Sequence, residues 1–147
     1  MKISSNNIDI SHLDLFDIAL QASQNAYSPY SNFRVGAALL IESGEVITGV
    51  NVENRSYGLT NCAERTAIYT AIAKGEKKFL KLAIATPDAS YPVPPCGACR
   101  QVISEFMEKN ALIIFGSSKE NIKVVKLEEL YPLDSLHELG KLKNKQV

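Results

Sequence analysis

Three cysteines constrain this chain more than any other feature, because they are the only ones among its 147 residues and they fall in two short motifs. Cys62 lies in the segment NCAER (61–65), and Cys96 and Cys99 lie in PCGACR (95–100). The N-terminus lacks the apolar stretch of an export signal, which predicts a reducing cytoplasm. An odd number of cysteines in that compartment favours metal binding or catalysis over a disulfide framework.

The spacing of Cys96 and Cys99 is typical of metal ligands, because one helical turn brings both sulfurs to the same point. Both motifs fall at predicted helix starts, where the helix dipole favours the thiolate that zinc requires. Three protein ligands on tetrahedral zinc leave a fourth position open for water, as in catalytic sites. We expect His12 and His137 to be ordinary surface residues. The chain is therefore predicted to bind one Zn²⁺ through Cys62, Cys96 and Cys99.

Glu64 follows Cys62 by two residues, so both side chains can line a pocket over the first turn of a helix. Alone, such a glutamate is typical of a favourable interaction with the helix dipole. Beside three cysteines it predicts a general acid–base, because an activated water needs a proton acceptor and the later step needs a donor. A ligand, one residue, Glu and then Pro-Cys-x-x-Cys is the pattern of zinc-dependent base deaminases.

The length predicts a single domain over residues 1–147, with flexible tails at about 1–10 and 140–147. The predicted elements are helices over 13–25 and 62–74, a third helix opened by Pro95, a helical turn at 128–131, and strands over 33–41, 46–52, 80–86, 111–115 and 122–127. This order predicts an α/β fold, in which helices pack on a mixed sheet of about five strands.

Local signals also predict the helix ends and buried faces. Ser11 is expected to cap the first helix, and Asn61 the second. The apolar positions of the first helix are Leu13, Phe16, Ile18, Leu20 and Ala22. Residues at helical spacing predict two buried faces: Ala63, Ala67, Ile68, Ala71 and Ile72; and Val102, Ile103, Phe106 and Met107.

Charge and hydropathy restrict the partners. Sixteen basic and sixteen acidic side chains give a net charge of zero, and the only basic cluster is Lys141, Lys143 and Lys145, which is typical of a solvated tail. Nucleic-acid binding is therefore not expected. No apolar run approaches the ~20 residues that span a bilayer, so we expect no membrane insertion.

The chain resembles the small homotetrameric cytidine deaminases. The resemblance covers nearly the whole length and rests on YSNFRVGAAL (30–39), NVEN (51–54), NCAERTA (61–67) and PCGACRQVI (95–103). It implies a three-layer α/β/α fold and a homotetramer with shared active sites. It also implies hydrolytic deamination of free cytidine and deoxycytidine, which belongs to pyrimidine salvage.

The resemblance implies roles for four residues outside the metal site. Phe33 would pack against the pyrimidine, Asn51 and Glu53 would hold the sugar hydroxyls, and the backbone of Ala63 would bind the base. Simpler interpretations stand beside these roles: Phe33 precedes a strand and suits a core, while Asn51 and Glu53 follow one and suit a turn.

Two arginines adjoin the site motifs. Zn²⁺ with three thiolates carries a net negative charge, which makes bound water a weaker acid. Arg65 and Arg100 are candidates to offset that charge by donating hydrogen bonds to the sulfurs. The alternative is that both are surface arginines.

The chain departs from the family pattern in three places. Arg34 replaces an uncharged residue, and Arg55 and Ser56 stand where small residues are typical, in a segment expected to reach a neighbour's site. Residues 129–134 lack the aromatic that usually closes over a neighbour's base, for which Tyr131 and Leu133 are candidate substitutes. These departures concern substrate preference rather than the chemistry.

Two alternative functions remain open. A zinc deaminase acting on a modified cytosine nucleoside, or on a cytosine-like antibiotic such as blasticidin S, would use the same motifs. A structural zinc module that binds protein or RNA would need a fourth protein ligand, and none is evident. Nucleotide, guanine and tRNA-adenosine deaminases usually begin the motif with His, so Cys62 argues against them.

Overall fold

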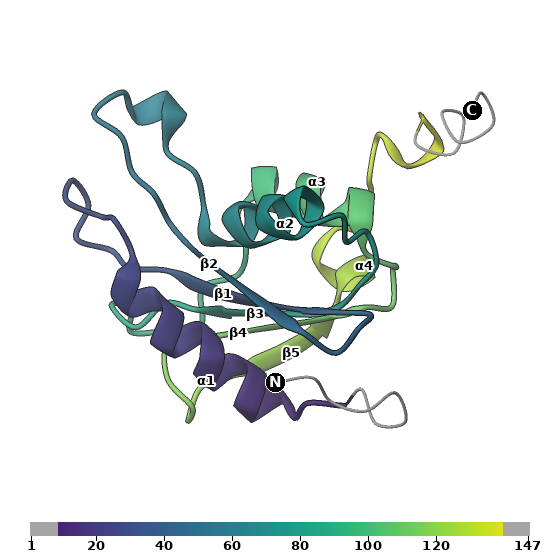
Figure 1. Ribbon diagram of the computed structural model, residues 1–147, viewed down its shortest axis with the longest axis horizontal. Helices are drawn as coiled ribbons and strands as arrows, with labels where there is room; N and C mark the ends of the chain where they lie inside the picture. The colour runs from purple at the N-terminus through teal and green to yellow at the C-terminus, as the bar shows by residue number, and fades with distance from the viewer. Residues whose placement is uncertain (1–8, 140–147) are drawn as a thin grey trace.

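The computed structural model describes residues 9–139 (Figure 1). Most of the predicted tails, and the lysines at 141, 143 and 145, lie outside the described residues. The elements are α1 (His12–Ala22), η1 (Ser23–Asn25), β1 (Gly36–Ile41), β2 (Val46–Val50), η2 (Tyr57–Leu59), α2 (Ala63–Ala73), β3 (Phe79–Ala85), α3 (Gly97–Phe106), β4 (Leu112–Gly116), β5 (Lys123–Lys126) and α4 (Leu127–Leu130).

The five strands form one mixed sheet in the order β2-β1-β3-β4-β5. β1 pairs antiparallel with β2 and with β3, β3 pairs parallel with β4, and β4 pairs antiparallel with β5. The parallel pair β3–β4 is connected through α3, as a crossover connection requires. The predicted mixed sheet of about five strands is confirmed.

Helices cover both faces of this sheet, with α1 on one face and α2 and α3 on the other (Figure 1). Successive side chains of a strand point to opposite faces, so each central strand contributes to two cores. Leu39, Leu82 and Ile113 pack on the α2–α3 side, whereas Leu40 and Ile114 pack on the α1 side. The predicted three-layer α/β/α architecture is confirmed.

Helix α1 begins as predicted, because the Ser11 hydroxyl accepts a hydrogen bond from the Asp14 amide. The predicted apolar positions of α1 are not all buried. Leu13 is 53% exposed, whereas Leu15, which is not among those positions, is fully buried beside Phe16. The buried stripe therefore runs through Leu15, Phe16 and Ala19, the spacing that one face of a helix on a sheet requires.

Helix α2 lies very close to β2, and a glycine makes this possible. A Cβ on Gly49 would lie 2.4 Å from both the Ala63 carbonyl oxygen and the Ala67 amide nitrogen. The buried face predicted for this helix is confirmed in Ala63, Ala67, Ile68 and Ala71. The first turn of α2 is therefore held directly against the sheet.

Both helices that carry the cysteine motifs begin one or two residues later than predicted. Asn61 does not cap α2; its amide donates to the Thr66 hydroxyl, and Cys62 occupies the N-cap. Pro95 does not open α3, because Cys96 takes the extended N-cap conformation and the helix starts at Gly97. Both helices start later for the same reason: the cysteine at the N-cap keeps extended dihedrals, so the first helical residue is the one after it.

No helix in residues 9–139 is long and apolar enough to cross a membrane.

Candidate metal centre and active site

The N-termini of α2 and α3 place the three cysteines. Cys62 and Cys96 are the N-cap residues of the two helices, and Cys99 lies at the third position of α3. The Cys96 sulfur accepts a hydrogen bond from the Cys99 amide at 3.4 Å, so it caps its own helix. Two helix N-termini thus face one group of sulfurs, and their dipoles favour negative charge there.

The three sulfurs lie within 4.8 Å of one another, and those of Cys62 and Cys96 are 3.9 Å apart. Tetrahedral zinc with Zn–S bonds of about 2.3 Å separates its sulfur ligands by about 3.8 Å. The residues present therefore fit Zn²⁺ in number, chemistry and spacing. Within residues 9–139 the clustered ligand group consists of these three cysteines, and neither His12 nor His137 belongs to it. This ligand set suits a catalytic rather than a closed structural site.

Glu64 lies in the first turn of α2 and points into the cluster. The residue is only 5% exposed, and its Oε2 lies 3.6 Å from the Cys99 sulfur, which donates to it. Burial raises the pKa of the Glu64 carboxyl to about 7. A carboxyl with a pKa near neutrality can both accept and return a proton, which suits a general acid–base.

The sulfurs differ in their proton affinity. A hydrogen bond with Cys99, and then a bond from the Arg65 guanidinium, lowers the pKa of the Cys62 thiol to about 5. The interaction with Cys62, together with burial, raises the pKa of the Cys99 thiol. Arg65 Nη2 donates to the Cys62 sulfur at 3.1 Å, so the structure brings this arginine to the sulfurs as the sequence predicts.

Arg100 takes a different place from the one its sequence position indicates. Its Nε donates to the Pro95 carbonyl at 2.8 Å and its Nη1 to the Leu130 carbonyl at 2.7 Å. The guanidinium therefore links the segment before Cys96 to the end of α4. The N–H groups that make these two bonds point to backbone carbonyls and not to the cysteine sulfurs, where the sequence placed Arg100. One of these two carbonyls belongs to Pro95, the residue directly before Cys96.

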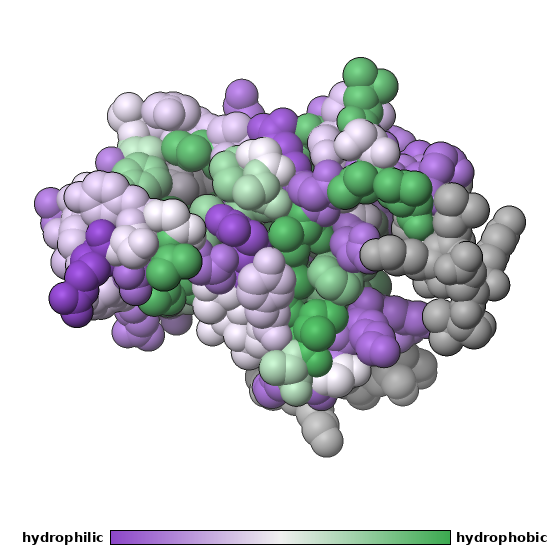
Figure 2. Space-filling view, turned by 90° about the horizontal axis from the view of Figure 1, so that it is seen from above, coloured by the Kyte–Doolittle hydropathy of each residue, from purple (hydrophilic) through white to green (hydrophobic). Residues whose placement is uncertain are grey.

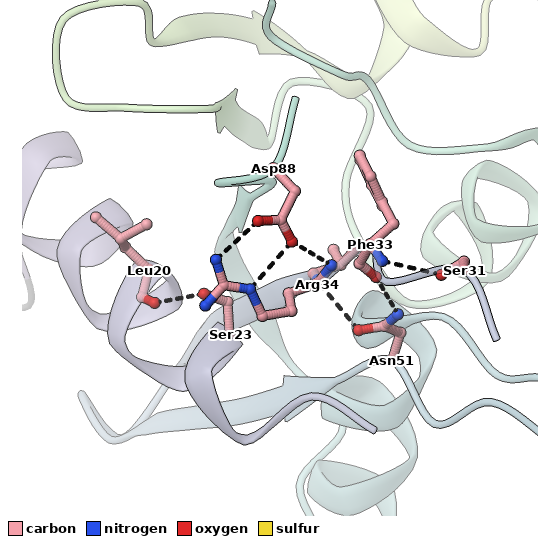
Figure 3. A network of polar contacts seen from close by, with 8 residues as sticks. Leu20, Ser23, Ser31, Phe33, Arg34, Asn51 and Asp88 are labelled. Carbon is pink, nitrogen blue, oxygen red and sulfur yellow. Dashed lines mark hydrogen bonds and ion pairs between the residues drawn. The ribbon is translucent and has the colours of Figure 1, made fainter. Parts of the chain in front are cut away.

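Asn51 is 7% exposed and lies beside Phe33. Its Nδ2 donates to the Phe33 carbonyl at 2.8 Å, and its Oδ1 accepts from the Val35 amide at 2.9 Å (Figure 3). Phe33 itself is half-buried and lies just before β1. The Asn51 amide group thus holds the segment that carries Phe33, in addition to any contact with a ligand.

Glu53 holds the preceding turn. Its Oε1 accepts from the Tyr30 and Ser31 amides, and its Oε2 accepts from the Ser31 hydroxyl at 2.5 Å. The hydrogen bond from the Ser31 hydroxyl lowers the pKa of the Glu53 carboxyl. The group therefore stays ionised at neutral pH.

A short backbone ladder connects these residues to the metal motif. Val52 exchanges hydrogen bonds with Asn61 at 3.0 Å in each direction, and Tyr27 bridges to Val52 on the other side. Asn61 directly precedes Cys62, and Ala63 is fully buried at the first position of α2. The segment with Asn51 and Glu53 is thereby joined to the first metal ligand.

Sequence reasoning did not identify three residues that organise the site. Ser31 binds Glu53 and also accepts from the Phe33 amide, Thr66 donates to the Cys62 carbonyl, and Asp88 binds Arg34. Thr66 lies four residues after Cys62, a spacing at which a helical hydroxyl contacts a backbone carbonyl, so helix periodicity could have indicated it. Arg34 and Asp88 are 54 positions apart, and no local pattern relates them.

Comparison with known proteins agrees with this geometry. A family model described as the cytidine and deoxycytidylate deaminase zinc-binding region matches residues 10–115. A cytidine deaminase of Halalkalibacterium halodurans is 48% identical over 114 residues, which cover 78% of this chain and 86% of that protein. The crystal structure of a cytidine deaminase from Burkholderia pseudomallei has a TM-score of 0.80 at 42% identity and covers 84% of this chain and 98% of its own. A blasticidin-S deaminase of Bacillus cereus is 35% identical over 136 residues, covering 86% of this chain and 94% of that protein.

Proposed function

Because the chain belongs to the cytidine and deoxycytidylate deaminase zinc-binding family, we propose that it hydrolyses free cytidine and deoxycytidine. Water replaces the exocyclic amine at C4 of the base, so the products are uridine or deoxyuridine and ammonia. The chain is a zinc-dependent hydrolytic deaminase, and Zn²⁺ supplies the Lewis acidity that lowers the pKa of a water.

The observation that carries this proposal is the meeting of Glu64 with the three sulfurs at two helix N-termini. Cys62, Cys96 and Cys99 would hold the metal. Glu64 would take one proton from the attacking water and deliver it to N3. It would then take the remaining proton, from the hydroxyl newly bound at C4, and deliver it to the departing amine. Its burial excludes bulk water, which would otherwise compete as a proton donor.

The substrate-binding roles are proposed from the surroundings of the metal centre. Phe33 would pack against the pyrimidine, the Ala63 backbone would bind the base, and Asn51 and Glu53 would hold the sugar hydroxyls. The ladder through Val52 and Asn61 supports this assignment, because it connects the sugar-binding segment to Cys62. Arg65 would offset the charge of the sulfurs, and Arg100 would act on the backbone before Cys96.

We propose that the active enzyme is a homotetramer in which neighbouring copies complete each site. The segment between β2 and α2 projects from the body of the chain (Figure 1) and exposes Tyr57 at 76% and Leu59 at 71%. Hydrophobic side chains stand among polar ones at the same end of the molecule in Figure 2. Leu133 is 88% exposed, whereas the Tyr131 hydroxyl donates to Gln101 of its own chain. Of the two candidates to replace the missing aromatic, Leu133 is therefore better placed than Tyr131 to contact the base bound in a neighbouring copy.

Sedimentation tests this assembly. The wild-type chain should sediment as a tetramer, and Leu59→Asp should dissociate it, because a carboxylate would be buried without a partner. Lys77→Asp, at an exposed position before β3, is the control and should remain tetrameric. A fully active wild-type monomer would contradict shared sites.

The compartment, the metabolic role and the domain organisation follow as further parts of the proposal. Three reduced cysteines persist in a reducing cytoplasm, which is where we place the enzyme. Deamination of a free nucleoside there serves pyrimidine salvage. Two cores share one sheet, which supports a single domain for residues 1–147.

A panel of substrates tests the function against its alternative. Ammonia release would be followed for cytidine, deoxycytidine, their 5′-monophosphates, cytosine and blasticidin S. We expect the two nucleosides to react with the highest kcat/KM. The more distant similarity to a blasticidin-S deaminase makes that antibiotic the second candidate, and its preference over cytidine would overturn the proposal. Glu64→Gln serves as the blank for contaminating deaminases.

A further inference from the structure

The backbone of residues 33–35 is held by two side chains, Asn51 and Asp88, which come from different parts of the fold. Asn51, which follows β2, bonds the Phe33 carbonyl and the Val35 amide. From the other side, Asp88 accepts the Arg34 amide hydrogen at 2.8 Å (Figure 3). The backbone from the Phe33 carbonyl to the Val35 amide is therefore fixed by side chains from two separate loops.

The Arg34 side chain strengthens the second attachment. Its Nε donates to Asp88 Oδ2 at 3.0 Å and its Nη2 to Oδ1 at 2.7 Å, so one carboxylate accepts three hydrogen bonds from a single residue. A forked pair of this kind fixes orientation as well as distance, because both parallel bonds must form together. Arg34, which departs from the family pattern, is thus paired with Asp88 of the same chain.

Asp88 is itself well anchored. Thr86, which is 2% exposed, donates its amide to the Gly116 carbonyl at 2.9 Å, and the Ala89 amide bonds back to the Thr86 carbonyl at 3.1 Å. The same loop runs on to Pro95, which is fully buried and directly precedes Cys96. The Arg34–Asp88 pair therefore joins the Phe33 segment to the loop that ends at the metal motif.

After Arg34, the chain continues through Val35 into β1, which lies against α1. A Cβ on Gly36 would lie 2.0 Å from the Ala19 carbonyl oxygen, so α1 lies directly against the backbone there. The Arg34 and Phe33 side chains leave this backbone in different directions (Figure 3). Arg34 thus reaches Asp88 and leaves Phe33 free to face another partner.

We propose that Asp88 is a positioning residue that acts through Arg34 to hold Phe33 in place against the pyrimidine ring. This inference rests on the proposed function, since it takes the ring to be that of the nucleoside base. Aromatic packing contributes equally to the bound substrate and to the transition state. Its loss should therefore raise KM more than it lowers kcat.

Steady-state kinetics with cytidine test the proposal. Asp88→Ala should raise KM by about tenfold, within the range that aromatic packing contributes, and should change kcat by less than about threefold. Asp88→Asn, which keeps one acceptor oxygen, should recover part of the loss. Glu45→Ala removes the partner of Lys74 in an exposed ion pair on the turn before β2, and this control should behave as wild type. Zinc content should be unchanged in every variant.

A cycle with Phe33 separates positioning from a general structural role. If Asp88 acts through Phe33, Asp88→Ala should raise KM in the wild-type background and leave it unchanged in a Phe33→Ala background. An equal increase in both backgrounds would overturn the proposal, as would an increase below twofold in wild type. Should Asp88→Ala fail to fold, Arg34→Ala replaces it, because that variant keeps the backbone bond to Asp88 and should show a smaller rise.

Fluorine NMR provides a readout independent of activity. The chain has five phenylalanines, so labelling with fluorophenylalanine gives five resonances, and that of Phe33 is identified by its absence in Phe33→Leu. Asp88→Ala should shift or broaden that resonance and leave the other four in place. An unchanged Phe33 resonance would overturn the inference. Absence of cytidine activity in wild type would overturn the proposed function instead, and the NMR result would still decide the positioning role.

Discussion

The Glu64 carboxylate lies 3.6 Å from the Cys99 sulfur, although the two residues belong to different helices. Glu64 is in the first turn of α2 and Cys99 in the first turn of α3. The contact brings the proposed proton carrier beside the metal ligands without making it one of them. Metal binding by the cysteines and proton transfer by Glu64 can therefore be tested by separate substitutions.

Glu64→Gln should separate proton transfer from metal binding. The amide keeps the size of the side chain but cannot take up a proton, so kcat for cytidine should fall by about 10²–10⁴-fold. Zinc content and melting temperature should stay near those of wild type, because the sulfurs are untouched. A zinc-loaded variant that turned over at the wild-type rate would show that the proton carrier is another group.

Removal of the metal should cost stability as well as activity. We expect one Zn²⁺ per chain by elemental analysis, and loss of activity with a strong chelator. Because the ligand bonds tie α2 to α3, chelated wild type and Cys99→Ser should both melt at lower temperature. Chelator should lower the melting temperature of the variant far less than that of wild type. Active protein without zinc would contradict this account.

Gly49→Ala should displace the first turn of α2. Its Cβ would meet the Ala63 carbonyl oxygen at 2.4 Å, so the helix carrying Glu64 would have to move away from β2. Overpacking of this kind costs about 1–3 kcal/mol, and zinc content should fall with it. Thr48→Ala, at the exposed neighbouring position of β2, is the matched control. Equal melting temperatures for the two variants would contradict the packing argument.

Cytidine should be deaminated at least about a hundredfold more efficiently than its 5′-monophosphate. Glu53 is ionised and would lie beside the sugar, where its carboxylate repels a phosphate. Arg34 does not compensate, because Asp88 occupies its guanidinium. Glu53→Gln should narrow the ratio of the two kcat/KM values, since the charge is lost while an acceptor remains. Comparable efficiency in wild type would instead indicate Arg55 as a phosphate ligand.

The Arg34–Asp88 pair should make stability depend on pH in the acid range. The hydrogen bond from the Arg34 guanidinium lowers the pKa of the Asp88 carboxyl to about 2, below the value of about 3.9 in an unfolded chain. The pair therefore stabilises the fold above about pH 4, and this contribution is lost as the pH falls toward 2. Since the pair is partly exposed, we expect at most about 1 kcal/mol.

Urea unfolding of wild type and Asp88→Asn measures this contribution. The difference in free energy of unfolding should be present at pH 7 and should shrink below pH 4. High salt should reduce it at pH 7. A difference that was the same at pH 7 and pH 3 would show that the carboxylate charge is not its cause.

Features that depend on short spacing along the chain could be predicted from the residues alone. Cys96 and Cys99 are one helical turn apart, so any helix starting there brings their sulfurs together. Short apolar runs likewise predicted all five strands, and apolar residues at helical spacing predicted the faces of α2 and α3, because both patterns follow from backbone geometry. The same reasoning reached zinc and a base deaminase, which the family match supports.

Contacts between segments that are distant along the chain depend on how the whole chain packs, and no local pattern predicted them. Spacing did not indicate that Asp88 would bind Arg34, that Asn51 would hold the Phe33 segment, or that Arg100 would bond two carbonyls. It also did not show which apolar residues of α1 are buried: Leu15 and Phe16 lie against the sheet, whereas Leu13 is exposed. Strand order determines which loops meet at the end of a sheet, and that order depends on the packing of the whole chain rather than on any local period.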